Sequence, residues 1–139
     1  MERERTQWSE LAMFLAIAFL LQSLRLLIPM IPGPVNLFFI GSLLNMVMAL
    51  AIWRTQTRWA AVIGLLLPIG AFFQGQLPIA LMIPVVAIGN AVFTLATGTL
   101  GSDRRAYLAP FLKAAVLFVG TQLVLRIFDL PVPMAKMLT

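Results

Sequence analysis

The stretch Pro29-Met30-Ile31-Pro32-Gly33-Pro34-Val35-Asn36 separates two strongly apolar runs and carries no charge. Its three prolines and one glycine cannot continue a helix, because proline lacks a backbone N–H and clashes with the preceding turn. A connection this short returns the chain beside itself, so we expect the flanking runs to be antiparallel neighbours. We place this turn at the outward-facing lip of a membrane bundle.

The composition on either side of this turn is that of a membrane protein. Of the 139 residues, 61% are hydrophobic and only 11% are charged, whereas a soluble domain has about a quarter of its residues charged. Several windows of about 20 residues are almost free of charge, which is the length that crosses the hydrocarbon core as a helix. We therefore expect a single integral membrane domain over residues 1–139, with the lipid bilayer as its surroundings.

The order of apolar runs predicts an all-α fold, a polytopic membrane helix bundle with five spans. The tail Leu130–Thr139 is too short to cross the membrane again. We place the spans at roughly Leu11–Pro29, Val35–Trp53, Trp59–Phe73, Leu77 to just before Gly101, and Ala106–Phe128.

The arginines set the expected orientation. In the five-span layout six of the eight arginines fall on one side, namely Arg3, Arg5, Arg54, Arg58, Arg104 and Arg105. The turn at 31–35 and the loop at 74–77 on the other side are uncharged. An excess of arginine marks the cytoplasmic side, so we expect the amino terminus inside and the carboxyl terminus outside. The net charge of +5 is thus explained by topology, and no nucleic-acid partner is expected.

Two glutamine–arginine pairs near the outer ends of spans are candidate ligand contacts. Gln22 and Arg25 lie three apart in span one, and Gln122 and Arg126 lie four apart in span five. Ionisable groups inside spans usually mark functional sites, so we expect both arginines to face one shared hollow. The alternatives are that Arg25 extends to the outer interface and that Arg126 forms a local ion pair with Asp129.

Aromatic and amide side chains cluster at the same expected depth. Phe39 and Phe73, together with Asn36, Gln74 and Gln76, predict an apolar pocket with a few polar groups, the usual composition of a small-molecule site. The alternative is a belt of phenylalanines at the interface. Deeper polar residues such as Asn45 and Asn90 are expected to hold helices together, and Lys113 is expected to extend toward the cytoplasmic interface.

Several chemistries are not expected. The chain has no cysteine and no histidine, which removes the usual metal and haem ligands. It also has no glycine-rich phosphate loop, no nucleophile–base set and no carboxylate pair inside the membrane. We therefore expect no enzyme activity, no metal and no cofactor.

In order along the chain, these segments resemble the substrate-binding (S) component of an energy-coupling factor (ECF) transporter, in particular its small members. The resemblance is carried by Ala12-Met-Phe-Leu-Ala16 with Leu20-Leu21-Gln22, Pro32-Gly33-Pro34-Val35-Asn36, Gly64-Leu-Leu-Leu-Pro68, and Met82-Ile83-Pro84 with Ile88-Gly89-Asn90. It covers most of the chain.

The resemblance implies a function, partners and a location. A bacterial cytoplasmic membrane would hold the chain, which would bind a vitamin or other small nutrient near the outer face. Ala12 and Ala16 match the Ala-x-x-x-Ala pattern that contacts the transmembrane coupling subunit, and separate ATPase subunits would supply energy. The family has six helices, so either the last one is missing here or a short or re-entrant segment makes up the sixth.

The sequence leaves a second function open beside the capture subunit. This alternative is a non-transport scaffold or assembly subunit of a larger membrane complex. In the scaffold, stripes of small residues such as Ala12 and Ala16 would serve packing alone. A carrier that acts alone by ion coupling is disfavoured, because the spans contain no carboxylate.

Overall fold

The computed structural model describes residues 2–27, 33–56, 58–77, 79–101 and 104–128. These ranges form helices and turns, and they contain no β-strand. The prediction of an all-α bundle is thereby confirmed. The elements are α1 (Glu2–Leu27), α2 (Gly33–Thr55), the 3-10 turn η1 (Arg58–Ala60), α3 (Ala61–Phe73), α4 (Met82–Leu100), the 3-10 turn η2 (Arg104–Tyr107) and α5 (Leu108–Ile127).

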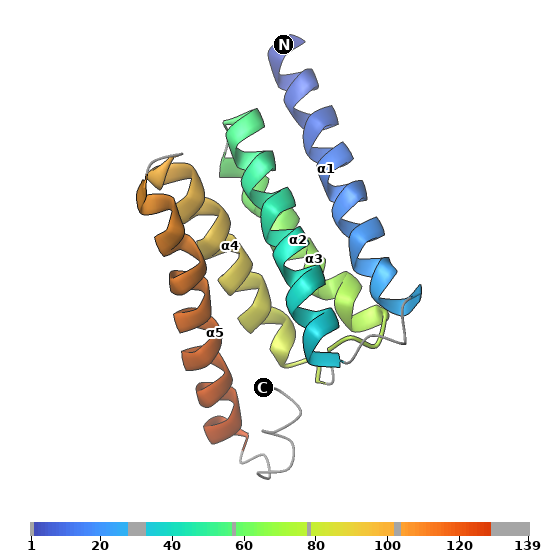
Figure 1. Ribbon diagram of the computed structural model, residues 1–139, viewed down its shortest axis with the longest axis vertical. Coiled ribbons are helices and arrows are strands. Elements are labelled where there is room, and N and C mark those ends of the chain that lie inside the picture. The colour runs from blue at the N-terminus through green and yellow to red at the C-terminus, as the bar shows by residue number, and fades with distance from the viewer. Residues whose placement is uncertain (1, 28–32, 57, 78, 102–103, 129–139) are drawn as a thin grey trace.

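Consecutive helices run in opposite directions (Figure 1). α1 and α5 form the two edges of the bundle, α2 lies in front of α3, and α4 lies between α5 and the α2–α3 pair. α1 and α2 are antiparallel neighbours, as the proline-rich turn predicts, although residues 28–32 lie outside the described ranges. We call the end with Arg54 and Arg58 the arginine-rich end, and the opposite end, with Gln74 and Gln76, the glutamine end.

The outer surface of the bundle is apolar along its length. Large side chains such as Leu20 (69% exposed), Phe38 (78%) and Phe118 (67%) project away from the bundle, which is unfavourable in water and favourable in lipid. α1, α2, α4 and α5 are each long and apolar enough to cross a membrane. The chain is therefore an integral membrane protein with transmembrane helices.

The third span is shorter than the others. The helical segment Arg58–Phe73, made of the 3 residues of η1 and the 13 of α3, is apolar but shorter than the other helices. At 1.5 Å per residue it rises about 24 Å, less than the ~30 Å of the hydrocarbon core. The described residues thus form five α-helices, as the sequence predicts, and four of these helices have full spanning length.

Three helix starts differ from the sequence-based expectation. α1 begins at Glu2, so the charged head of the chain is helical as well. α2 begins at Gly33, because a proline in the first turn needs no intrahelical N–H bond. α4 begins at Met82 instead of Leu77, after a turn in which the Met82 N–H bonds the Ile79 carbonyl at 3.0 Å.

Pro68 explains how α3 and α4 are joined. It lies inside α3, and because it has no N–H, the carbonyl four residues earlier, on Gly64, has no intrahelical donor. The Asn90 side-chain amide of α4 donates to this carbonyl at 3.1 Å. Gly64 also permits the close approach, since a Cβ there would lie 2.9 Å from the Asn90 Cβ. Asn90 is thus a packing residue, as the sequence predicts.

Beside this junction lies the hydrophobic core. It is formed mainly by buried side chains of α1, α2, α3 and α4, whereas α5 buries only Ala109 and Val124 among its described residues. The core residues are Leu11, Ala18, Val47, Met48, Ala51, Ile52, Ala60, Ile63, Leu67, Phe93 and Ala109.

Candidate functional site

A cavity of about 310 Å³ reaches across the bundle and is lined by all five α-helices. This volume lies at the lower end of the ~300–1,000 Å³ of small-molecule sites. Most of its lining side chains are apolar, with a few amides and two cations between them. We call it the amide cavity, lined by Gln22, Arg25, Ile40, Gly41, Leu44, Met48, Leu67, Pro68, Ala71, Gln76, Leu77, Met82, Val86, Asn90, Lys113, Leu117 and Thr121.

A network of side-chain amides closes the cavity at the glutamine end. Arg25 Nη1 donates to Gln76 Oε1 at 3.3 Å. The Gln76 amide group donates to the Gln22 carbonyl at 3.0 Å and to Gln74 Oε1 at 2.6 Å, and Gln74 Nε2 donates to Ser23 Oγ at 3.0 Å. We call these five residues the glutamine network. It ties the α3–α4 loop to α1 and brings together four residues that the sequence proposes for ligand contact.

Gln22 is the most buried member of this network. Its side chain is only 1% exposed, and its Nε2 donates to the Leu67 carbonyl at 3.3 Å. Its Oε1 is the one fully buried side-chain oxygen or nitrogen, among the described residues, that has no hydrogen-bond partner. A buried acceptor without a donor costs about 1–3 kcal/mol. A ligand that donates a hydrogen bond to this oxygen would remove that cost.

Lys113 supplies the second cation of the cavity. Its Nζ donates to Asn45 Oδ1 of α2 at 2.6 Å and lies 5.6 Å from the centre of the Phe93 ring. The expectation that Lys113 extends toward the interface is therefore wrong, because its amine turns inward to an amide oxygen. The same hydrogen bond joins α5 to α2.

Sequence reasoning missed Lys113 as a cavity residue, although a signal was present. Lys113, Leu117 and Thr121 are spaced by four residues and so follow one stripe of α5, which is the stripe that lines the cavity. A charge within an apolar span, in register with a polar residue two turns later, favours an inward-facing stripe.

The structure does not bring Gln122 and Arg126 to this cavity. At 100° per residue, Gln122 is turned by about 100° and Arg126 by about 140° from Thr121. Both side chains are exposed on α5 and are not among the residues that line the amide cavity. Arg25 and Arg126 thus do not share the hollow that the sequence analysis expects.

The remaining pocket candidates lie near the glutamine end but outside the cavity lining. Asn36 is buried in α2, with 7% of its surface exposed. Phe39 and Phe73 are exposed, and the Phe73 ring packs edge-on against Phe72, with 6.1 Å between the ring centres. Ala12 and Ala16 are exposed on α1, so both are available to a partner helix.

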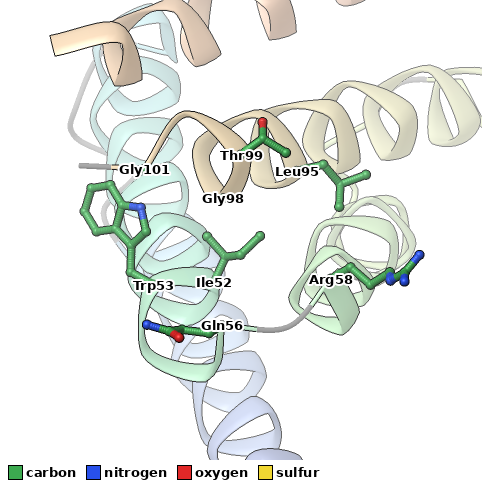
Figure 2. Close-up of a pocket in the computed structure, with 8 residues that line it drawn as sticks. All are labelled: Ile52, Trp53, Gln56, Arg58, Leu95, Gly98, Thr99 and Gly101. Atoms are coloured by element: carbon green, nitrogen blue, oxygen red, sulfur yellow. The ribbon is translucent and has the colours of Figure 1, made fainter. Parts of the chain in front are cut away.

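A second hollow lies at the arginine-rich end (Figure 2). Ile52 of α2 and Leu95 of α4 point into it, and Arg58 lies on the side opposite Trp53. Its volume is about 620 Å³, but Gln56 and Arg58 are exposed, so a charge bound here would stay in water. It is lined by Ile52, Trp53, Gln56, Arg58, Leu95, Gly98, Thr99 and Gly101.

The amide cavity is therefore the candidate site, since it combines an apolar lining with cations, amides and an unsatisfied acceptor. No known protein family, curated protein or solved structure matches this chain. The function is accordingly argued from the chemistry of the amide cavity.

Proposed function

We propose that this protein is the membrane-embedded substrate-capture subunit of an ECF-type importer. In this role it binds a small, partly anionic nutrient and depends on separate ATPase and coupling subunits. One observation carries the proposal: the amide cavity offers Arg25, Gln22 and Gln76 around an apolar interior of about 310 Å³. This is the composition of a specific small-molecule site.

The proposal includes an orientation in a bacterial cytoplasmic membrane. The arginine-rich end faces the cytoplasm, in keeping with the positive-inside rule, and the glutamine end faces outward. A nutrient would then enter from the outside beside the glutamine network. The chain itself offers no nucleotide-binding loop, so energy has to come from partner subunits.

α1 supports the proposed contact with a coupling subunit. Ala12 and Ala16 are exposed and lie on one helix face, and small residues at this spacing allow a second helix to approach closely. The remainder of that face is apolar, with exposed Met13, Ile17 and Leu20. It is thus suited to a helix–helix contact inside the membrane.

Co-purification tests the assembly. The tagged chain is extracted from its native membrane, and the proteins and small molecules that remain bound are identified by mass spectrometry. Recovery of ATPase and coupling subunits together with a small molecule supports capture. A ligand-free homo-oligomer recovered without ATPases would instead indicate the scaffold function.

Uptake by variants tests the site. We expect Arg25→Gln to reduce uptake of the recovered nutrient by tenfold or more, because a charge-assisted hydrogen bond is lost. Arg126→Gln removes an exposed arginine from the same end and is expected to leave uptake unchanged. Equal uptake by the wild type and Arg25→Gln would remove Arg25 from the site.

A second variant pair tests the docking face. Ala16→Phe adds bulk to the exposed face of α1 and is expected to abolish recovery of the coupling subunit while ligand binding persists. Ala114→Phe places the same bulk on the exposed face of α5 and is the matched control. Recovery of the partner with Ala16→Phe would show that this face does not dock it.

A further inference from the structure

We infer that the ligand of the amide cavity carries two negatively charged groups, one at each end of an apolar body. This inference rests on the proposed capture function and names its substrate class. It follows from the positions of two cations, from the absence of carboxylates that would neutralise them, and from the lining between them.

The two cations belong to opposite edges of the bundle. Arg25 is part of α1 and Lys113 is part of α5, and Figure 1 shows these helices at the two sides of the molecule. Both residues line the same cavity, and we place one charge toward each end of it. A ligand with a single anionic group would reach one of these cations and leave the other without a counter-charge.

Neither cation has an ion-pair partner among the residues that the structure describes. Arg25 donates to an amide oxygen of Gln76, and Lys113 donates to an amide oxygen of Asn45. The sequence has no aspartate or glutamate between residues 11 and 102, or between 104 and 128. Cations inside a membrane are costly and are normally paired. Two positive charges without carboxylates therefore call for two negative charges from the ligand.

The lining between the charges specifies the middle of the ligand. Leu44 and Leu117 are apolar lining residues, which favours a hydrocarbon body. The volume of about 310 Å³ lies at the lower end of small-molecule sites, so the ligand is small.

Binding of simple dicarboxylates tests the inference. The purified chain in lipid nanodiscs is titrated by calorimetry with linear α,ω-dicarboxylates of increasing length and with monocarboxylates of the same lengths. We expect an optimum length at which the dicarboxylate binds at least tenfold more tightly than its monocarboxylate. Equal affinity of the two series, or no binding by either, would overturn the inference.

Variants of the two cations test which cation binds each acidic group of the ligand. Lys113→Gln and Arg25→Gln are each expected to remove the preference for the dicarboxylate, whereas Lys113→Arg retains the charge and the preference. Arg5→Gln, which removes an exposed charge at the arginine-rich end, is the matched control. A preference that persists in Lys113→Gln would show that Lys113 does not bind the second group.

The small molecule retained by the native protein separates this inference from the proposed function. A retained compound with two acidic groups supports both. A neutral, cationic or monoacidic compound recovered with ATPase and coupling subunits overturns the dianion and leaves nutrient capture intact. A dicarboxylate preference without any such partners supports the dianion site and counts against capture for an importer.

Discussion

At the scale of single residues, the backbone N–H that Pro68 lacks explains a hydrogen bond between α3 and α4. Pro68 leaves the Gly64 carbonyl without its helical donor, and Asn90 supplies the replacement from the next helix. In lipid no water molecule can donate a hydrogen bond to such a carbonyl, so another protein group has to do so. One proline thus explains why an asparagine is buried in α4.

A double-mutant cycle tests this pairing. Asn90→Ala leaves the Gly64 carbonyl unsatisfied, and we expect it to lower the free energy of unfolding by about 1–3 kcal/mol. In the Pro68→Ala background, residue 68 regains an N–H for that carbonyl, so the same change should cost about 1 kcal/mol less. Unfolding by SDS in mixed micelles measures both losses. Equal losses in the two backgrounds would contradict the pairing.

Gly64 gives a second prediction at this scale. A Cβ at this position would lie 2.9 Å from the Asn90 Cβ and 3.1 Å from the Asn90 backbone carbon. We expect Gly64→Ala to destabilise the bundle by about 1–3 kcal/mol through overpacking. Gly41→Ala is the control, since its Cβ would meet no atom within 4 Å. Similar thermal midpoints for the two variants would show that α3 can move away.

At the scale of elements, α5 is the least embedded helix of the bundle. It packs mainly on α4, and among its described residues only Ala109 and Val124 are buried. The hydrogen bond from Lys113 to Asn45 connects it to α2 as well. This hydrogen bond adds a polar contact to the apolar packing of α5 on α4.

We therefore expect Asn45→Leu to destabilise the protein by about 1.5–3 kcal/mol, because the Lys113 amine loses its amide acceptor. The double variant Asn45→Leu/Lys113→Met removes both polar partners and should be more stable than Asn45→Leu alone. Thermal unfolding in nanodiscs measures both. A double variant that is less stable than Asn45→Leu would show that other contacts of the Lys113 amine contribute more to stability.

The same helix shows what the sequence can and cannot predict. The apolar runs and the proline-rich turn predict five antiparallel helices, because length and hydropathy decide spanning segments. The rotation of α5 is harder to predict, because this helix carries polar residues on two faces, Lys113 and Thr121 on one and Gln122 and Arg126 on another. Lys113 faces the cavity and Arg126 does not, and this depends on packing against α4. The sequence does predict that Gln22, Arg25 and Gln76 are neighbours. They lie near the same ends of their helices, and short connections bring those ends together.

At the scale of the whole molecule, the amide cavity is the space that all five helices leave between them. We expect Val86→Trp to fill part of this space, to lower affinity for the retained ligand by tenfold or more and to leave the fold intact. Val119→Trp adds the same bulk to an exposed position on α5 and should not affect binding. Equilibrium binding and circular dichroism measure the two effects, and full affinity in Val86→Trp would place the ligand elsewhere.

The short third helix has a consequence for the surrounding membrane. Leu65 and Ile69 of α3 are exposed to lipid, yet the segment is about 6 Å shorter than the hydrocarbon core. Lipid tails beside a short segment have to compress or disorder, at a modest cost for each ångström of mismatch. We expect a local dimple in the bilayer along this side of the protein. A thicker bilayer should therefore destabilise the protein, and the preferred host membrane is a thin one.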